Sequence, residues 1–262
     1  MKETNLLVIL YDAIVNYPKT IRVIAYSYKR MFAYTLLLVS LASIPNFLDT
    51  LQVFDLLASN GQSVANQIPA YEIADGKMTA SGTEPFIFKT DLMTYAYDPD
   101  NQITTDQVTS GNGSLITLEN NTDNVTLTIM GQAMAFTYDQ LADSASSEGL
   151  KEIVIAMSTL SLAYYPLVFI MVVLGNLFNI LLAAIMIAII IGLLPDAIRL
   201  RLKFKMRLHL AIVAITMPLI VITVCNLFGL YAIYQLELMY LFALVRIWQL
   251  LKKVQVIKIP KD

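Results

Sequence analysis

Histidine and cysteine are almost absent from this chain of 262 residues, which contains only His209 and Cys225. One residue of each kind makes a His-based triad or a site with several His ligands unexpected, and it rules out a disulfide within the chain. The sequence also has no glycine-rich loop of the kind that cradles nucleotide phosphates. We therefore expect no catalytic residues, no metal site and no cofactor, and a protein that is not an enzyme.

Charged residues are scarce as well, and one long run has none. The chain is 57% hydrophobic and 15% charged, with a mean hydropathy of +0.63. The run Ile153–Pro195 contains 43 residues without a charged side chain. A helix needs only ~20 apolar residues to span a bilayer, and an uncharged run twice as long is not expected in a helix of a soluble core. The sequence therefore predicts an integral membrane protein.

The few charges are divided sharply along the chain. Residues 51–150 hold 13 acidic and two basic residues, a formal charge of −11, whereas the remaining seven acidic and 16 basic residues give +9. Such an asymmetry is typical of an acidic domain on one side of a membrane and basic loops on the cytoplasmic side. It argues against nucleic acid as a partner, because phosphate binding requires a basic surface on the soluble part.

The N-terminal part is expected to lie inside the cell. Residues 1–30 form a predicted cytoplasmic amphipathic segment in the membrane interface, with a first helix that ends near Pro18. Residues 31–50 form the first predicted transmembrane helix, an uncleaved anchor with Pro45 near its outer end. Basic residues precede this span, and this places the N-terminus on the cytoplasmic side.

Residues 51–150 have the composition of a folded domain outside the bilayer. Apolar and polar residues alternate with the period of two that is typical of strands. The candidate strands are Ala70–Ile73, Phe86–Thr90, Met93–Tyr97, Leu115–Glu119, Val125–Met130 and Ala133–Tyr138. Hairpin turns are predicted at Asp75-Gly76 and Gly131-Gln132. We expect an acidic, β-rich extracytoplasmic domain.

Aromatic residues recur two positions apart in three of these strands, which places each pair on one face of its strand. The pairs are Phe86 with Phe88, Tyr95 with Tyr97, and Phe136 with Tyr138. One interpretation is a surface that stacks on sugars. The favoured interpretation is the core of a β-sandwich or barrel.

Residues 151–195 allow two layouts. A single straight helix over Ile153–Pro195 would be ~63 Å long, about twice the hydrocarbon thickness. Either an outer helix bends at Pro166 into one tilted span, transmembrane helix 2, or two spans turn near Gly175-Asn176. One crossing leaves the basic cluster that follows on the cytoplasmic side, so the positive-inside rule favours the first layout.

The remaining segments complete four predicted spans with both termini in the cytoplasm. Residues 196–209 form a basic cytoplasmic loop, 210–251 contain transmembrane helices 3 and 4, and 252–262 form a basic cytoplasmic tail. The candidate contacts with anionic lipid headgroups or a cytoplasmic partner are Arg199, Arg201, Lys203, Lys205 and Arg207.

Three polar residues fall within the predicted spans. Asn176 and Asn179 are three positions apart and share a helix face, and Glu237 lies in the last span. Polar groups at membrane depth face protein or a water path. They serve either to hold helices together, which is the favoured interpretation, or to line a transport path.

Three local patterns resemble a known family. They are Tyr17-Pro18-Lys19 before the first span, the stretch Ile68–Met78 that opens the predicted outer domain, and the long apolar run followed by the basic loop and the segment Leu210–Pro218. Together they resemble the Gram-positive membrane proteins of unknown function labelled maltodextrin-utilisation proteins. The stretch from the basic loop through Pro218 also has a weaker likeness to Yip1-type membrane proteins. The resemblance implies the cell membrane of a Gram-positive bacterium and a role beside a sugar ABC importer. It carries no catalytic or ligand residues.

We therefore expect an α-helical polytopic membrane protein with about four transmembrane helices and a small β-rich extracytoplasmic domain between the first and second spans. The expected function is that of an accessory or regulatory protein that contacts a partner through this domain. The alternative is a small oligomeric transporter or channel. The sequence is compatible with a homo-oligomer and does not determine the oligomeric state.

Overall fold

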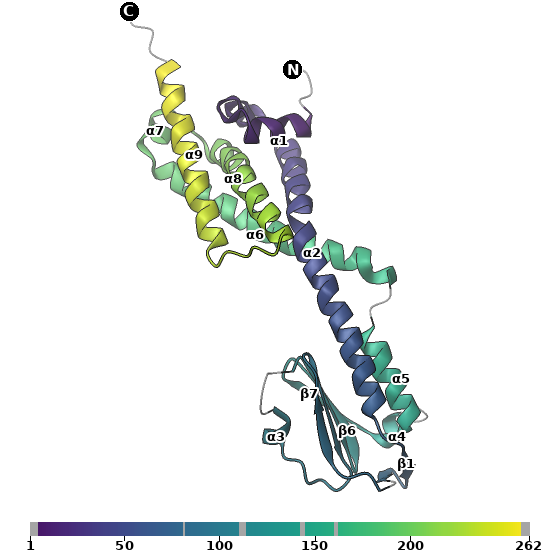
Figure 1. Ribbon diagram of the computed structural model, residues 1–262. Coiled ribbons are helices and arrows are strands. Elements are labelled where there is room, and N and C mark those ends of the chain that lie inside the picture. The colour runs from purple at the N-terminus through teal and green to yellow at the C-terminus, as the bar shows by residue number, and fades with distance from the viewer. Residues whose placement is uncertain (1–4, 81, 110–113, 142–144, 160–161, 258–262) are drawn as a thin grey trace, which may run out of the picture. The chain divides into compact units, whose positions relative to one another are not determined.

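A computed structural model describes residues 5–80, 82–109, 114–141, 145–159 and 162–257. The chain divides into two compact units (Figure 1). The first unit consists of residues 1–48 and 165–262, and the second of residues 49–164. The uncharged run and its flanks thus fall largely in one unit and the acidic stretch in the other.

The regular elements of the first unit, in the residues that the structure describes, are all helices. Its elements are α1 (Leu6–Ile14), the 3₁₀ helix η1 (Tyr17–Ala25), the first part of α2 (Tyr28–Gln67), α6 (Tyr165–Leu193), α7 (Pro195–Arg199), α8 (Phe204–Leu227) and α9 (Gln235–Ile257). α8 is the central helix, because every residue from His209 to Thr216 is buried. It packs against α6, α9, η1 and α1, and the hydroxyls of Tyr34 on α2 and Thr216 lie 2.8 Å apart.

Within the described part of the chain, three helices are long and apolar enough to cross a membrane, namely α2, α6 and α8. α9 is of similar length, with 23 residues, but contains Glu237, Arg246, Lys252 and Lys253. α6 is continuous through Gly175 and Asn176, so the layout with a turn at these residues is wrong. Glycine and asparagine only weakly disfavour a helix, and the surrounding apolar residues pack against α8.

α2 is much longer than the sequence predicts. The first span is predicted over residues 31–50, but α2 is a single helix of 40 residues that begins at Tyr28 and ends at Gln67. Its later part buries Leu57, Val64 and Ala65 in the core of the second unit. Leu57 and Val64 are seven positions apart and so lie on one face of α2. Burial of this face in the core of the second unit stabilises the continuation of the helix beyond Pro45.

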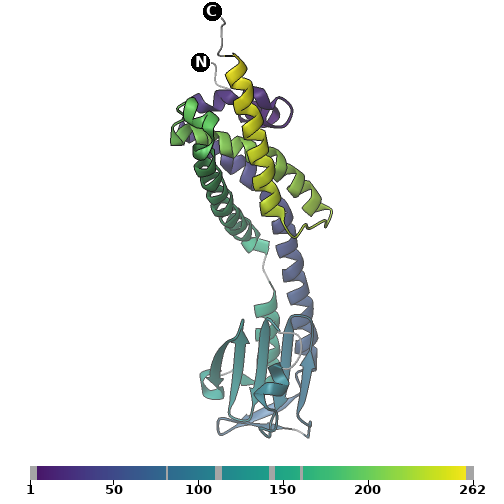
Figure 2. The same ribbon diagram turned by 90° about the vertical axis from the view of Figure 1, so that its left-hand side faces the viewer.

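The second unit is built on one five-stranded sheet. The strands are β3 (Phe86–Lys89), β4 (Met93–Asp98), β5 (Ile116–Asn121), β6 (Asn124–Ile129) and β7 (Gln132–Thr137), in this order across the sheet. β4 and β5 pair in parallel and the other neighbours pair antiparallel. The short helix α3 (Thr105–Thr109) lies in the crossover that parallel pairing requires. Figure 2 shows the strands side by side.

The remaining elements of the second unit flank this sheet. They are the hairpin β1 (Tyr71–Ala74) and β2 (Lys77–Ala80), the short helix α4 (Tyr138–Leu141), α5 (Ser147–Ser158) and the 3₁₀ turn η3 (Leu162–Tyr164). All six predicted strands are confirmed, and β2 is an additional one. Positive φ angles place one turn at Asp75-Gly76, as predicted, and the other at Met130-Gly131, one residue before the prediction.

The aromatic pairs serve mainly as core. Tyr95 and Tyr97 are fully buried, and Tyr138 is 1% exposed. They belong to one apolar cluster with side chains of α2 and α5. A single sheet covered by helices replaces the predicted sandwich or barrel, because helices supply the second layer that a sheet face needs.

Candidate functional site

A small polar cleft opens between four helices of the first unit, α2, α6, α8 and α9. Its volume is about 160 Å³. The polar side chains that line it are Asn46, Asn176, Asn179, Thr223, Asn226 and Gln235. No charged side chain of the described residues lines the cleft. It can therefore offer hydrogen bonds without a fixed charge.

Most of these amides pair across helix boundaries. The Asn176 Nδ2 donates to Ser43 Oγ at 2.9 Å, and the Asn46 Nδ2 donates to Asn176 Oδ1 at 3.2 Å. On the opposite side, the Gln235 Nε2 donates to Asn226 Oδ1 at 2.7 Å. These bonds connect α2 to α6 and α8 to α9, as expected for residues that hold helices together in a membrane.

Asn179 differs from the other amides of the cleft. Its side chain is exposed, and it forms no hydrogen bond with any described residue. Glu237, in contrast, does not join the asparagines: it is exposed in the first turn of α9 and does not line the cleft. The sequence-predicted trio thus separates into two asparagines at one site and a glutamate elsewhere.

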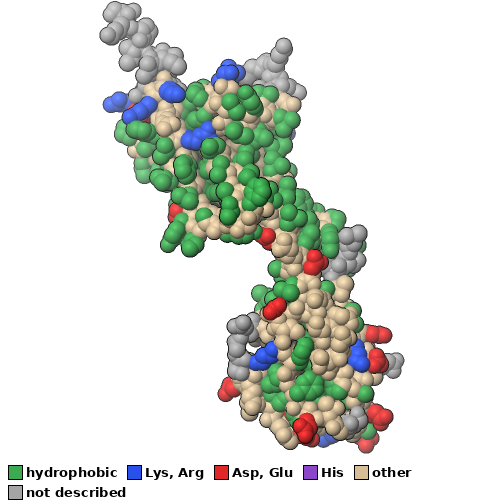
Figure 3. Space-filling model, viewed as in Figure 1, with side chains coloured by type: hydrophobic (Ala, Val, Ile, Leu, Met, Phe, Trp, Pro, Cys, Tyr) green, Lys and Arg blue, Asp and Glu red, His purple; other side chains and the backbone are tan. Residues whose placement is uncertain are grey.

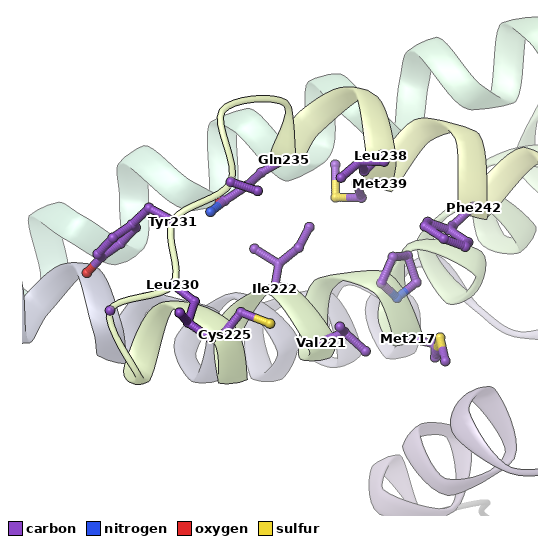
Figure 4. A pocket seen from close by; sticks show the side chains of 13 residues that line it. Met217, Val221, Ile222, Cys225, Leu230, Tyr231, Gln235, Leu238, Met239 and Phe242 are labelled. Atoms are coloured by element: carbon purple, nitrogen blue, oxygen red, sulfur yellow. The ribbon is translucent and has the colours of Figure 1, made fainter.

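A larger apolar groove adjoins the cleft between α8 and α9. Its volume is about 650 Å³ (Figure 4). The side chains that line it include Met217, Val221, Cys225, Leu230, Leu238 and Phe242. Ile222, Gln235 and Met239 line both the groove and the cleft. The two spaces are therefore neighbours that share part of their lining.

The basic cluster divides into exposed and bundle-facing residues. Arg199, Arg201 and Lys203 are exposed at the connection between α7 and α8. The Lys205 Nζ lies 4.9 Å from the centre of the Tyr28 ring, and the Arg207 Nη1 donates to the backbone oxygen of Ala188 at 3.4 Å. Lysine and arginine side chains gather at this end of the unit (Figure 3).

Arg246 has a role that sequence reasoning missed. Its Nη2 donates to the backbone oxygen of Ala13 at 2.6 Å, so the side chain points into the helical unit. Its guanidinium carbon lies 4.0 Å from the centre of the Tyr17 ring. Burial raises the pKa of Tyr17 well above its usual range, so its hydroxyl stays neutral. Arg246 thus ties α1 and η1 to α9.

A polar cluster lies inside the core of the second unit. The Tyr138 hydroxyl donates to Asn120 Oδ1 at 2.7 Å. Burial raises the pKa of Tyr71, Tyr95 and Tyr138 above the usual range, so these side chains stay neutral. Uncharged hydroxyls around a buried amide are typical of a structural network.

We expect the contribution of Glu119 to the stability of the second unit to be more favourable in acid than at neutral pH. Burial, and secondarily the neighbouring Asp98, raises the pKa of Glu119. A raised folded pKa stabilises the fold below the unfolded pKa, and this contribution is lost as pH rises through the folded value. Glu119→Gln should therefore raise stability at neutral pH by less than about 1 kcal/mol and leave it unchanged in acid. Thermal unfolding at both pH values tests this, and an equal effect at both would contradict it.

One edge of the sheet has no pairing strand among the residues that the structure describes. β7 is the last strand of its sheet, and its residues are exposed except for the partly buried Phe136. It contains neither a charged residue nor proline. The opposite edge, β3, ends in Lys89. Proteins usually protect edge strands with lysine, proline or a covering segment, so an uncharged open edge is a site for pairing with another strand.

The family model described as "Protein of unknown function (DUF1189)" matches residues 9–251. The match covers most of the chain, so the chain belongs to this family. No curated protein and no solved structure matches it. The family description specifies no activity, and the function therefore has to follow from the geometry.

Proposed function

We propose that this member of the DUF1189 family is a non-enzymatic integral membrane protein with an accessory or regulatory role. It acts by protein–protein contact through its second unit, which lies outside the cell. The open edge of β7 carries this proposal, because a strand of a partner can extend the sheet there by main-chain hydrogen bonds.

The proposed topology has four spans in the cell membrane of a Gram-positive bacterium. α9 is the fourth, with Lys252 and Lys253 at its cytoplasmic end. The exposed apolar side chains of α1, which include Leu7, Tyr11 and Val15, fit a helix that lies in the cytoplasmic interface. The exposed basic residues of the α7–α8 connection would contact anionic headgroups there.

The first partner to test is a sugar ABC importer. This choice rests on the resemblance of the sequence to maltodextrin-utilisation proteins, and the likeness to Yip1-type proteins adds nothing to it. A different partner would keep the accessory role and discard the link to carbohydrate.

A lysine on the open edge should prevent the contact. We expect Ala135→Lys to reduce recovery of the partner roughly tenfold or more after in-cell crosslinking, because an inserted charge blocks strand pairing. The control, Gln67→Lys, adds the same charge at another exposed position of the unit. Gentle purification and quantitative mass spectrometry measure the recovery. Equal recovery with both variants, or a wild-type protein recovered alone, would count against the proposal.

A small oligomeric transporter or channel is the second candidate function. The cleft favours it, because polar side chains from several helices meet there. Flux through liposomes containing the wild type and a variant with Asn176, Asn179 and Glu237 replaced by leucine would test it. Equal flux would remove this candidate.

A further inference from the structure

We propose that the cleft and the adjoining groove together bind one lipid molecule whose headgroup is uncharged and carries hydroxyl groups, such as a diacylglycerol. The acyl chain would occupy the groove between α8 and α9. The headgroup would hydrogen-bond in the cleft. This inference does not depend on the partner of the second unit.

The groove has the size and chemistry for an acyl chain. Its volume of about 650 Å³ lies within the range of about 300–1,000 Å³ that is typical of small-molecule sites. It is formed by side chains from α8, α9 and their connection, and these are almost all apolar. Gln235 is the one amide among its lining residues, and it stands where the groove meets the cleft.

The cleft determines which headgroup fits. Amides and the Thr223 hydroxyl offer both donors and acceptors, so they match a hydroxyl group, which also does both. A phosphate needs cationic partners, and no lysine or arginine of the described residues lines either space. The cleft therefore favours an uncharged headgroup over a phosphate-bearing one.

Asn179 is the residue best placed to contact the headgroup. Ser43 bonds Asn176, and Asn226 bonds Gln235, so these groups are already engaged. Asn179 is exposed at the cleft and has no hydrogen-bond partner among the described residues. In the proposed topology this helix of the first unit lies in the membrane, where an amide without a partner is costly unless water or a ligand satisfies it.

Photolabelling of the purified full-length protein tests the proposal. The probe is a diacylglycerol with a diazirine in its acyl chain, and phosphatidylglycerol with the same diazirine is the comparison. We expect the diacylglycerol probe to label peptides of α8 and α9 more strongly. Asn179→Leu should lower this labelling roughly fivefold, the loss of about one hydrogen bond.

Two further variants make the test decisive. Leu238→Trp should fill the groove and reduce labelling with the cleft intact, whereas Gln249→Leu, an exposed change farther along α9, should have no effect. Size-exclusion profiles and melting curves show whether each variant is folded. Equal labelling by both probes, or labelling that Asn179→Leu and Leu238→Trp leave unchanged, would mean that only bulk lipid fills the groove and would overturn the proposal.

Discussion

Replacing Gly61 by leucine should destabilise the second unit by about 3 kcal/mol or more, the largest effect we expect from a single substitution. A Cβ atom at Gly61 would lie 2.0 Å from Ser158 Oγ and 2.3 Å from Ser158 Cβ. α2 and α5 therefore touch at this point, and no side chain fits between them. Hydrogen exchange of β4–β6 peptides in the full-length protein should show roughly a 100-fold loss of protection.

Two comparisons separate this effect from helix propensity. Replacing a glycine by alanine within a helix normally stabilises the fold by about 1 kcal/mol. A loss of stability in Gly61→Ala would therefore already indicate the close contact with Ser158. Combining Gly61→Ala with Ser158→Gly should restore stability, because the second change removes the Ser158 Oγ and Cβ atoms that an added Cβ would clash with. Gly175→Leu is the matched control, since nothing lies within 4 Å of its added Cβ. Similar losses from Gly61→Leu and Gly175→Leu would contradict the explanation.

Replacing Arg246 by leucine should release α1 and η1 from the first unit. The change removes the charge-assisted hydrogen bond to Ala13 and the stacking on Tyr17. Together these contacts, which are partly shielded from water, contribute about 2–4 kcal/mol to the free energy that holds α1 and η1 in place. Local opening of the N-terminal segment should therefore become roughly 30-fold more frequent or higher.

Thiol labelling measures this opening. Thr20 is 2% exposed on η1, so Thr20→Cys in a Cys225→Ser background reports exposure through its rate of reaction with a membrane-permeant maleimide. The rate should rise with Arg246→Leu and stay constant with Gln249→Leu, an exposed change one turn further along the same helix. A constant rate in Arg246→Leu would show that apolar packing of α1 and η1 suffices.

Local patterns predicted the elements that depend on nearby residues. Alternation located the strands, and the uncharged run located α6 (Tyr165–Leu193). The three-residue spacing of Asn176 and Asn179 correctly indicated a shared helix face, and both line the cleft. These features follow from the fixed periods of helix and strand, so they can be read without knowing what packs against them.

Partners distant in the sequence left no such signal. Arg246 and Ala13 are 233 positions apart, and the parallel pairing of β4 with β5 arises from a crossover rather than a hairpin. The continuation of α2 beyond Pro45 depends on burial of Leu57 and Val64 against the sheet. Glu237 could not be separated from the asparagines, because the orientation of α9 is set by its packing on α8.

By itself the sequence determined that this protein has apolar segments long enough to span a membrane and an acidic β-rich region, because composition and short-range periodicity encode these properties. Only the tertiary structure decided which side chains meet. The cleft, the adjoining groove, the Arg246 contact and the open edge of β7 each join or expose residues from separate elements. Such contacts depend on how whole elements pack, and packing is a property of the folded chain rather than of any one stretch of it.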